Sequence, residues 1–313
     1  MNDDEIRLKV VNTYHVKLLR EPDKEGLQFW FNEIKSGRVD VNSLASTFES
    51  LDEFRKLEDL RKGYTITKEG FDLFLDPQDW VISRALSINK VWEPEETKFF
   101  RQILHEEMTV VDVGANIGYF TVLFSKIVGE RGRVISFEPD PGSYSILQKN
   151  VKENNLANVL AIQKAVADFC GKAKLYLSKT NHGDNRMSST IIEDIDIERE
   201  VIDVDVTSLD DALKDINIDF LKIDTQGAEM KVINGAQKMI KRNKNLKIAL
   251  EFWPIGLRSQ MSEPSDLLSK LREMGFDIYD MKEKVGMKNI SNEELCAKYA
   301  GKSFTNLYCV KNK

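Results

Sequence analysis

Three carboxylates follow apolar segments that have the length and composition of buried strands. Glu138 comes after VISF, Asp224 comes after FLKI, and Glu251 ends KIALE. A carboxylate in such a place can accept hydrogen bonds from ligand hydroxyls or remove a proton from a reacting group. Parallel strands bring their carboxyl ends to one edge of a sheet, where ligands bind. We therefore expect the three side chains to share one crevice.

A glycine turn precedes the first of these carboxylates. The segment VVDVGANIGYF, residues 110–120, is typical of a strand, a tight turn at Gly114 and a helix that begins near Gly118, where the missing side chain lets the helix start pack close to the strand. Pyrophosphate-binding turns carry the pattern G-x-G-x-x-G, but Asn116 and Tyr119 replace two of its glycines. A nicotinamide-dependent oxidoreductase is therefore disfavoured.

The same turn suits a ligand that has both a carboxylate and an ammonium group. The amides at the helix start would face the carboxylate, and Asp112 would accept from the ammonium, as at the methionine end of S-adenosylmethionine. Glu138 stands about 20 to 25 positions beyond the turn, where an acidic residue accepts hydrogen bonds from ribose hydroxyls. Each motif alone is common in purely structural roles, but in this order they predict a cofactor site.

The carboxylates farther along the chain are the candidates for acid–base chemistry. In a methyl transfer the protein mainly holds the acceptor oxygen against the methyl carbon, and a base takes the hydroxyl proton. Asp224 is the predicted base, with Glu251 as a further catalytic candidate, although Asp224 could instead cap the turn at Gly227. Lys222 would orient Asp224, pair with Glu229 or extend toward solvent. Asp224, Glu229 and Glu251 would also suit Mg²⁺, but we predict no metal site.

One histidine and one tryptophan are the remaining candidates. His182 is one of only three histidines and lies in the polar stretch Thr180–Ser189. It is a second candidate for the general base, because histidine changes charge near neutral pH; a surface histidine without a role is the alternative. Trp253, close to Glu251 in sequence, either walls the acceptor pocket or packs in the core.

The hydrophobic pattern from Thr109 onward supplies a framework for these residues. Apolar strands alternate there with amphipathic helices, which indicates an α/β fold with a mostly parallel sheet covered on both faces. The predicted strands are 110–113, 133–137, 159–163, 220–223 and 247–251, and the predicted helices are 119–128, 143–154 and 229–242. Two additional strands, 173–177 and 201–206, interrupt the alternation, and 276–281 with 306–310 would form an antiparallel edge pair.

The N-terminal part of the chain has a different pattern. Apolar residues recur every four positions from Ile6 to Leu18, and the first 62 residues show helical periodicity alone. From Gly63 onward short extended segments appear, followed by helices at 79–88 and 93–104. We predict two domains, a small all-α domain over 1–62 and a larger α/β domain over 63–313.

The composition of the chain limits which binding partners and which cellular compartment we expect. The chain has 45 basic and 51 acidic residues, a net charge of −6, so it lacks a global positive field and we expect no nucleic-acid partner. Its three cysteines are widely spaced, its N-terminus lacks the features of a signal peptide, and no apolar stretch reaches the roughly 18 residues of a membrane span. These features favour a cytoplasmic protein with reduced thiols.

Five segments together resemble one family. DVGANIGYFT, SFEPDP, VTSLDDAL, FLKIDTQGAEMKVINGA and LEFWP resemble the FkbM-type family of class I S-adenosylmethionine-dependent methyltransferases, over residues 76–311. The resemblance implies a Rossmann-like sheet of seven strands with the last strand antiparallel, and methyl transfer to a hydroxyl oxygen, often on sugars or polyketides. Gln226 stands where many relatives carry Glu, so we assign it no acid–base role.

The resemblance also assigns residues. The family's cofactor positions fall on Asp112, Gly114, Asn116, Gly118 and Glu138, with Trp92 and Glu93 near them, and we add Ala115, Pro139 and Ala165. Alternatively, Trp92 and Glu93 would only pack against and cap a helix that begins at Pro94. A GDNR-like stretch is frequent in the family, which implies acceptor contacts for Asp184, Asn185 and Arg186, and Trp253 would join them.

The N-terminal segment is similar to a second family. LLREPDKEGLQFWFNEIKSGR and ASTFESLDEFRKL resemble a short bacterial domain of unknown function that accompanies glycosyltransferases and surface-layer proteins. This context points to glycan biosynthesis and to a protein partner for the helices. We therefore expect an O-methyltransferase that acts on a saccharide hydroxyl in a glycan or polysaccharide precursor. The alternative is a non-catalytic scaffold that binds S-adenosylmethionine.

Overall fold

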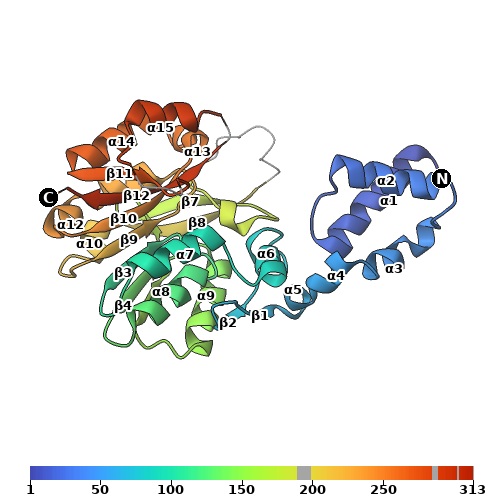
Figure 1. Cartoon of the computed structure of the whole chain (residues 1–313), viewed down its shortest axis with the longest axis horizontal. Helices are drawn as coiled ribbons and strands as arrows, with labels where there is room; N and C mark the ends of the chain where they lie inside the picture. Colours follow the sequence, from blue (N-terminus) through green and yellow to red (C-terminus); the bar gives the residue numbers. More distant parts are fainter. Residues whose placement is uncertain (189–198, 284–287, 302, 313) are drawn as a thin grey trace.

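The computed structural model describes residues 1–188, 199–283, 288–301 and 303–312. Ser189, the last residue of the predicted polar stretch, and Lys313, the end of the predicted second domain, lie outside the described residues. Figure 1 shows a sheet flanked by helices and a smaller group of helices joined to it by a narrow connection. The N-terminus lies in the smaller group, and the C-terminus lies beside the sheet.

The main sheet has seven strands in the order β11-β12-β10-β9-β3-β4-β5. Strand β12 pairs antiparallel with β10 and β11, whereas β10, β9, β3, β4 and β5 pair in parallel. The expected Rossmann-like fold is therefore confirmed, with the last strand of the chain antiparallel. The strands are β3 (Thr109–Val113), β4 (Arg133–Phe137), β5 (Val159–Ile162), β9 (Phe220–Ile223), β10 (Lys247–Phe252), β11 (Phe276–Asp280) and β12 (Thr305–Lys311).

Helices cover both faces of this sheet (Figure 1). In β3, Val110 packs in one apolar core and Val111 in another, so the strand is buried on both sides. The predicted helix 229–242 is interrupted at Gly235, where a Cβ would lie 2.1 Å from the carbonyl oxygen of Ala167. None of the helices in the described part of the chain is long and apolar enough to cross a membrane. The helices are α8 (Tyr119–Val128), α9 (Pro141–Glu153), α10 (Leu209–Ala212), α11 (Glu229–Asn234), α12 (Gln237–Arg242), α13 (Pro254–Ser259), α14 (Pro264–Glu273) and α15 (Asn292–Lys298).

The two additional strands of the prediction belong to a separate sheet of three strands, in the order β6-β8-β7. Strands β7 (Gly171–Leu177) and β8 (Glu200–Thr207) pair antiparallel, and β6 (Ala165–Val166) pairs in parallel with β8. The loop after β7 contains a short 3-10 turn, η3 (His182–Asp184), and then returns to pair Arg186 with Tyr176. Residues of this loop reach the same pocket as the ends of the main strands.

The N-terminal helices enclose a small apolar core of their own. They are α1 (Asp3–Thr13), η1 (Tyr14–Leu18), α2 (Lys24–Lys35), η2 (Val41–Ser43), α3 (Leu44–Glu49), α4 (Asp52–Lys56) and α5 (Glu58–Lys62). Val10, Tyr14 and Phe48 are buried in this core. Leu57 and Leu60 already pack in a core of the α/β part, so the packing changes before the predicted boundary at residue 62.

Two short strands and two helices connect the N-terminal helices to the sheet. Strands β1 (Tyr64–Ile66) and β2 (Asp72–Phe74) pair antiparallel, and helices α6 (Ile82–Asn89) and α7 (Pro94–Ile103) follow. The predicted helix at 79–88 starts later, at Ile82. The reason is that the Asp79 carboxylate accepts hydrogen bonds from the amides of Val81 and Ser83, so Asp79 caps the helix from outside.

Candidate active site

A pocket of about 430 Å³ opens at the edge of the main sheet where the parallel strands end. Its walls come from residues after β3, β4, β9 and β10, from the loop after β7 and from the start of α7. Asp112 and Gly118 are not among its lining residues. The other residues predicted from the sequence line it, namely Trp92, Glu93, Gly114, Ala115, Asn116, Glu138, Pro139, Ala165, His182, Asp184, Asn185, Arg186, Lys222, Asp224, Glu251 and Trp253.

Two glycines shape the turn after β3. Gly114 has a φ of +80°, and a Cβ there would lie 1.8 Å from the carbonyl oxygen of Asp224. Because only glycine permits this approach, Gly114 brings the ends of β3 and β9 together. Gly118 has a φ of +89°, and its Cβ would lie 2.4 Å from Cδ1 of Leu147 in α9. The predicted neighbour of Gly118 was wrong, since this glycine makes room for the next helix and not for the strand.

The amides of this turn already have acceptors within the protein. The N–H groups of Gly114 and Ala115 donate to a carbonyl at the end of β4. The N–H of Asn116 donates to Glu138 Oε2 at 2.8 Å, and that of Ile117 donates to the side-chain oxygen of Asn116. These four turn amides therefore need no further partner, and a contact between a ligand carboxylate and the amides at the start of α8 stays a prediction.

Glu138 lines the pocket but is buried, with 6% of its surface exposed. Its two carboxylate oxygens accept the amides of Asn116 and Asp140, at 2.8 and 2.9 Å. Burial raises the pKa of Glu138 to about 8 in spite of these donors. A carboxylate has about four acceptor positions, so a ligand hydroxyl can still donate to Glu138.

Asp112 lies behind the pocket wall and is fully buried. Its Oδ2 accepts a hydrogen bond from the Thr121 hydroxyl at 2.7 Å, and its Oδ1 lies 3.7 Å from the Lys222 ammonium. Burial raises the pKa of Asp112, and the charge of Lys222 opposes that rise. This geometry favours a supporting role, in which Asp112 holds Lys222, over the predicted contact with a ligand ammonium.

Lys222 projects from β9 into a group of carboxylates. Its ammonium lies 3.4 Å from Asp224 and 3.7 Å from Asp112. Burial alone would lower the pKa of Lys222, but the charges of Asp224 and Asp112 raise it above the usual value. Lys222 therefore holds its proton and can orient the Asp224 carboxylate.

Glu229 closes the turn after β9. Its Oε1 accepts the amide of Thr225, the hydroxyl of Thr225 and the amide of Gly227, at 3.0, 3.0 and 3.1 Å. Burial raises the pKa of Glu229 to about 7. The alternative in which Asp224 caps this turn is therefore wrong, because Glu229 accepts the turn amides while Asp224 faces the pocket.

Gln226 links the two carboxylates at the strand ends. Its Nε2 donates to Asp224 Oδ1 at 2.9 Å and to Glu251 Oε2 at 3.1 Å. Glu251 is buried, and burial together with the charge of Asp224 holds the pKa of Glu251 well above its usual range. The Asp224 side chain keeps 30% of its surface exposed. Asp224 is thus the better placed to meet an acceptor, and Glu251 the better suited to keep a proton.

These carboxylates are not arranged as a metal centre. Across the described ranges, no group of three or more His, Cys, Asp or Glu residues is placed to hold a metal ion. Glu229 faces turn amides, while Asp224 and Glu251 are bridged by the Gln226 amide. The Mg²⁺ alternative therefore has no support in the part of the chain that is described.

Two glutamates at the start of α7 face the same group. Glu93, predicted beside Trp92 near the cofactor, has a φ of +42° and lines the pocket. Its Oε2 is buried and, within the described residues, has no hydrogen-bond partner. Burial and the charge of Glu96 hold the pKa of Glu93 well above its usual range. Glu96, which accepts a hydrogen bond from Asn306, was missed because it looks like any acidic residue in a first helical turn.

The predicted acceptor residues in the loop after β7 form part of the pocket wall. Arg186 is buried, its Nε lies 3.4 Å from Asp184 Oδ1, and its guanidinium carbon lies 5.9 Å from the centre of the Trp253 ring. Asn185 turns back onto the loop, where its Oδ1 accepts the amide of Ser178 at 2.9 Å. Arg186, Asp184 and Trp253 therefore form a continuous stretch of wall, and Asn185 supports the loop.

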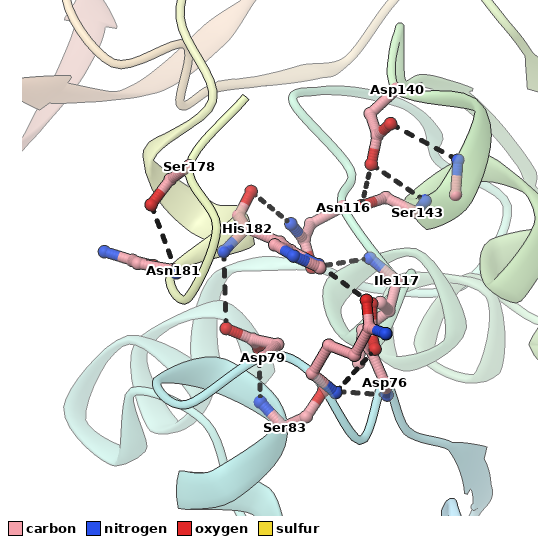
Figure 2. Close-up of polar contacts among 12 residues, drawn as sticks. Asp76, Asp79, Ser83, Asn116, Ile117, Asp140, Ser143, Ser178, Asn181 and His182 are labelled. Atoms are coloured by element: carbon pink, nitrogen blue, oxygen red, sulfur yellow. Dashed lines mark hydrogen bonds and ion pairs between the residues drawn. The ribbon is translucent and has the colours of Figure 1, made fainter. Parts of the chain in front are cut away.

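His182 contacts two acidic residues that the sequence did not single out (Figure 2). Its Nδ1 lies 2.8 Å from Asp76 Oδ2, and its peptide N–H donates to Asp79 Oδ1. The hydrogen bond with Asp76 raises the pKa of His182, although burial opposes the rise. A histidine that holds its proton more firmly is a poorer base near neutral pH, so the geometry favours Asp224 as the base.

The chain matches the family model of the methyltransferase FkbM domain. The match covers residues 112–278. This range runs from β3 to β11 and contains the glycine turn, Glu138 and the strand-end residues Lys222, Asp224 and Glu251.

Known proteins are also similar to this chain. Methyltransferase 1 of Beauveria bassiana is 30% identical over 147 residues, which make up 42% of this chain and 59% of that protein. Methyltransferase sdnD of Sordaria araneosa is 27% identical over 201 residues, 54% of this chain and 73% of that protein. The chain therefore spans less than two thirds of the first of these relatives. A solved SAM-dependent O-methyltransferase from Thermotoga maritima has 10% identity and a TM-score of 0.41, covering 71% of this chain and 67% of that one.

Proposed function

Because this chain belongs to the FkbM family of S-adenosylmethionine-dependent methyltransferases, we propose that it transfers the methyl group to a hydroxyl oxygen of a saccharide. The observation that carries the oxygen acceptor is the Asp224 carboxylate, which faces the pocket between Lys222 and Gln226. An aromatic ring and polar groups in the wall, Trp253 with Asp184, suit a sugar. The net charge of −6 supports a neutral acceptor over a nucleic acid.

The pocket suits S-adenosylmethionine in size and chemistry. Its volume of about 430 Å³ lies within the ~300–1,000 Å³ usual for sites that enclose a small ligand. Glu138 offers a buried carboxylate for ribose hydroxyls, and Glu93 offers a buried oxygen without a partner in the described chain, which can accept a hydrogen bond from the ligand. When bound, the cofactor supplies an electrophilic methyl group.

The side chains of the protein then have to hold the acceptor and take one proton. Asp224 accepts a hydrogen bond from the acceptor hydroxyl and removes its proton as the oxygen becomes nucleophilic. The Lys222 ammonium, 3.4 Å from Asp224, orients the carboxylate for this contact. Gln226 fixes the Asp224 carboxylate through its 2.9 Å hydrogen bond, and Glu251, whose pKa is raised by burial, accepts the second hydrogen bond of the same amide.

Two measurements test this function. Calorimetric titration with S-adenosylmethionine and S-adenosylhomocysteine tests the cofactor, and we expect both to bind, with weaker binding to Glu138→Ala. Incubation of a saccharide panel with S-adenosylmethionine labelled in its methyl group tests the acceptor, and we expect the label in a methyl ether. Label on nitrogen or carbon would contradict oxygen transfer. Binding without transfer to any acceptor would favour the non-catalytic scaffold.

We also propose that residues 1–62 form a separate domain that binds a protein partner in glycan assembly. The independent apolar core of these helices supports the division. Limited proteolysis of the full chain tests it, because two separately packed cores should leave two resistant fragments, an N-terminal one that ends before Leu57 and one that contains the main sheet. Initial cleavage inside the main sheet would contradict the division.

A further inference from the structure

One wall of the pocket comes from a loop and not from strand ends. Residues 181–187, in the loop that leaves β7, all line the pocket. At one end of this segment Arg186 pairs with Tyr176 of β7, whereas residues 180–183 pair with no strand in the described part of the chain, so their position depends on the groups that contact them. The question is which residues hold this wall in place.

The segment between β2 and α6 supplies those contacts (Figure 2). Asp76 Oδ2 lies 2.8 Å from His182 Nδ1, and only 15% and 18% of the two side chains are exposed. Asp79 Oδ1 accepts the peptide N–H of His182 at 3.3 Å, and the peptide N–H of Trp80 donates to the carbonyl of Thr180 at 2.7 Å. Asp76, Asp79 and Trp80, all before α6, thus hold two positions near the tip of the loop, Thr180 and His182.

His182 also joins the loop to the glycine turn. Its carbonyl accepts a hydrogen bond from Asn116 Nδ2 at 3.1 Å. The peptide N–H of Asn116 donates in turn to Glu138 Oε2 at 2.8 Å. A continuous series of contacts therefore runs from Asp76 through His182 and Asn116 to Glu138, the predicted ribose acceptor.

The contact between Asp76 and His182 is a charged pair over a defined pH range. The acidic groups that raise the pKa of His182 are Asp76, through its hydrogen bond, Asp79 before α6 and Asp140 at the start of α9. Burial opposes ionisation of Asp76, but the hydrogen bond from His182 lowers the pKa of Asp76 below its usual value. A raised histidine pKa stabilises the fold fully below the unfolded value of about 6.5, and this contribution is lost as pH rises through the folded value.

We propose that Asp76 is a positioning residue of this methyltransferase, which acts through His182 to hold the loop after β7 against the glycine turn and so completes the cofactor pocket. The inference rests on the proposed use of the pocket and deepens it. Asp76 is not among the residues that line the pocket, and it precedes the range matched by the family model, 112–278. Its effect is therefore expected on cofactor affinity and not on the chemical step.

The test compares Asp76→Asn with the wild type, both as the full chain. We expect the Kd of S-adenosylhomocysteine to rise roughly 10- to 100-fold, the range for a lost hydrogen bond between charged groups, and kcat at saturating cofactor to stay within about threefold. The chain has three histidines, so NMR titration can follow His182, assigned with His182→Gln. We expect Asp76→Asn to lower the His182 pKa toward its ordinary value, and Asp76→Glu to recover part of the affinity.

A matched control and two outcomes make the test decisive. Asp203→Asn breaks an exposed ion pair with Lys174, between strands β7 and β8 of the same small sheet, and should leave the Kd unchanged. If the wild type binds and transfers methyl groups while Asp76→Asn binds equally well, this inference is overturned and the proposed function stands. If the wild type does not bind S-adenosylhomocysteine, the proposed function fails instead. Should Asp76→Asn not fold, His182→Gln provides the same comparison, and an unchanged Kd there also overturns the inference.

Discussion

Two walls of one pocket are built in different ways. On one side, Glu138, Asp224 and Glu251 sit at the ends of parallel strands, and the register of the sheet brings them together. On the other side, His182 is held by Asp79, a residue 103 positions away, and by Asp76. At the strand ends, a change at a close backbone approach should therefore disturb the fold and a change of a carboxylate should alter the chemistry. A change in the loop contacts should alter affinity and leave the sheet intact.

The largest effect is expected where the strand-end wall depends on a close backbone approach. Gly114→Ala introduces a Cβ 1.8 Å from the Asp224 carbonyl oxygen at a φ of +80°. We expect the free energy of unfolding to fall by more than about 2 kcal/mol and binding of S-adenosylhomocysteine to be lost, as measured by chemical denaturation and calorimetry.

Gly70→Ala is the matched control for this change. Gly70 has a φ of +81°, but no heavy atom lies within 4 Å of the added carbon. It should cost about 1 kcal/mol through backbone strain alone and leave binding unchanged. Equal losses in the two variants would show that the approach of β3 to β9 does not matter.

The next largest effect is expected at Asp224 in the same wall, where a substitution should change the rate of methyl transfer and not the binding of the cofactor product. Asp224→Asn should lower kcat about 10²- to 10⁴-fold, because an amide cannot take the acceptor proton, and change the Kd of S-adenosylhomocysteine less than about threefold. Asp219→Asn is the control, since Asp219 is exposed at the opposite end of β9, where it accepts the Thr109 amide. Weaker binding with an unchanged kcat would assign Asp224 to ligand binding.

A pH titration sharpens the role of Glu138. Burial raises its pKa to about 8, so the side chain is protonated below that pH, and a ribose hydroxyl that donates to the carboxylate must displace the proton. The affinity for S-adenosylhomocysteine should therefore increase by up to about tenfold per pH unit below 8 and level off above it. Glu138→Gln should remove this dependence. A flat wild-type profile is incompatible with the ribose contact.

The smallest effect is expected at the residue between the two strand-end carboxylates. Gln226→Glu replaces a donor that lies 2.9 Å from Asp224 and 3.1 Å from Glu251 with a third carboxyl group. Asp224 and Glu251 lose their shared amide donor, so kcat should fall by less than about tenfold while the Kd of S-adenosylhomocysteine stays unchanged. An unchanged kcat would mean that the hydrogen bond from Gln226 does not fix the Asp224 carboxylate.

The strand-end wall could largely be predicted from the sequence, because hydrophobic runs determine where strands end. The predicted limits of β4 and β9 are the observed ones, and Glu138 and Asp224 follow them into the pocket. The hydrophobic pattern does not show which polar groups already have hydrogen-bond or ion-pair partners within the protein. The turn amides donate internally, and Asp112 faces Thr121 and Lys222 behind the wall.

Residues of the loop wall were predicted, but the contacts that hold it could not be, because they join distant parts of the chain. Asp76 and Asp79 belong to a DPQD segment that by itself indicates only a turn. Glu96 contacts Asn306, 210 positions away, and no local pattern signals that pairing. The family resemblance assigned no role to these acidic residues. The roles of Asp76 and Asp79 emerge only once the loop after β7 is packed against the segment before α6.

The most direct test of the central claim follows one methyl group. Wild type and Asp224→Asn are each incubated with a saccharide acceptor and S-adenosylmethionine carrying a ¹³C methyl group, and the product is examined by NMR. The account predicts a methyl ether signal with the wild type and almost none with Asp224→Asn, although both bind S-adenosylhomocysteine. A labelled methyl on nitrogen or carbon, or equal transfer by both proteins, would contradict it.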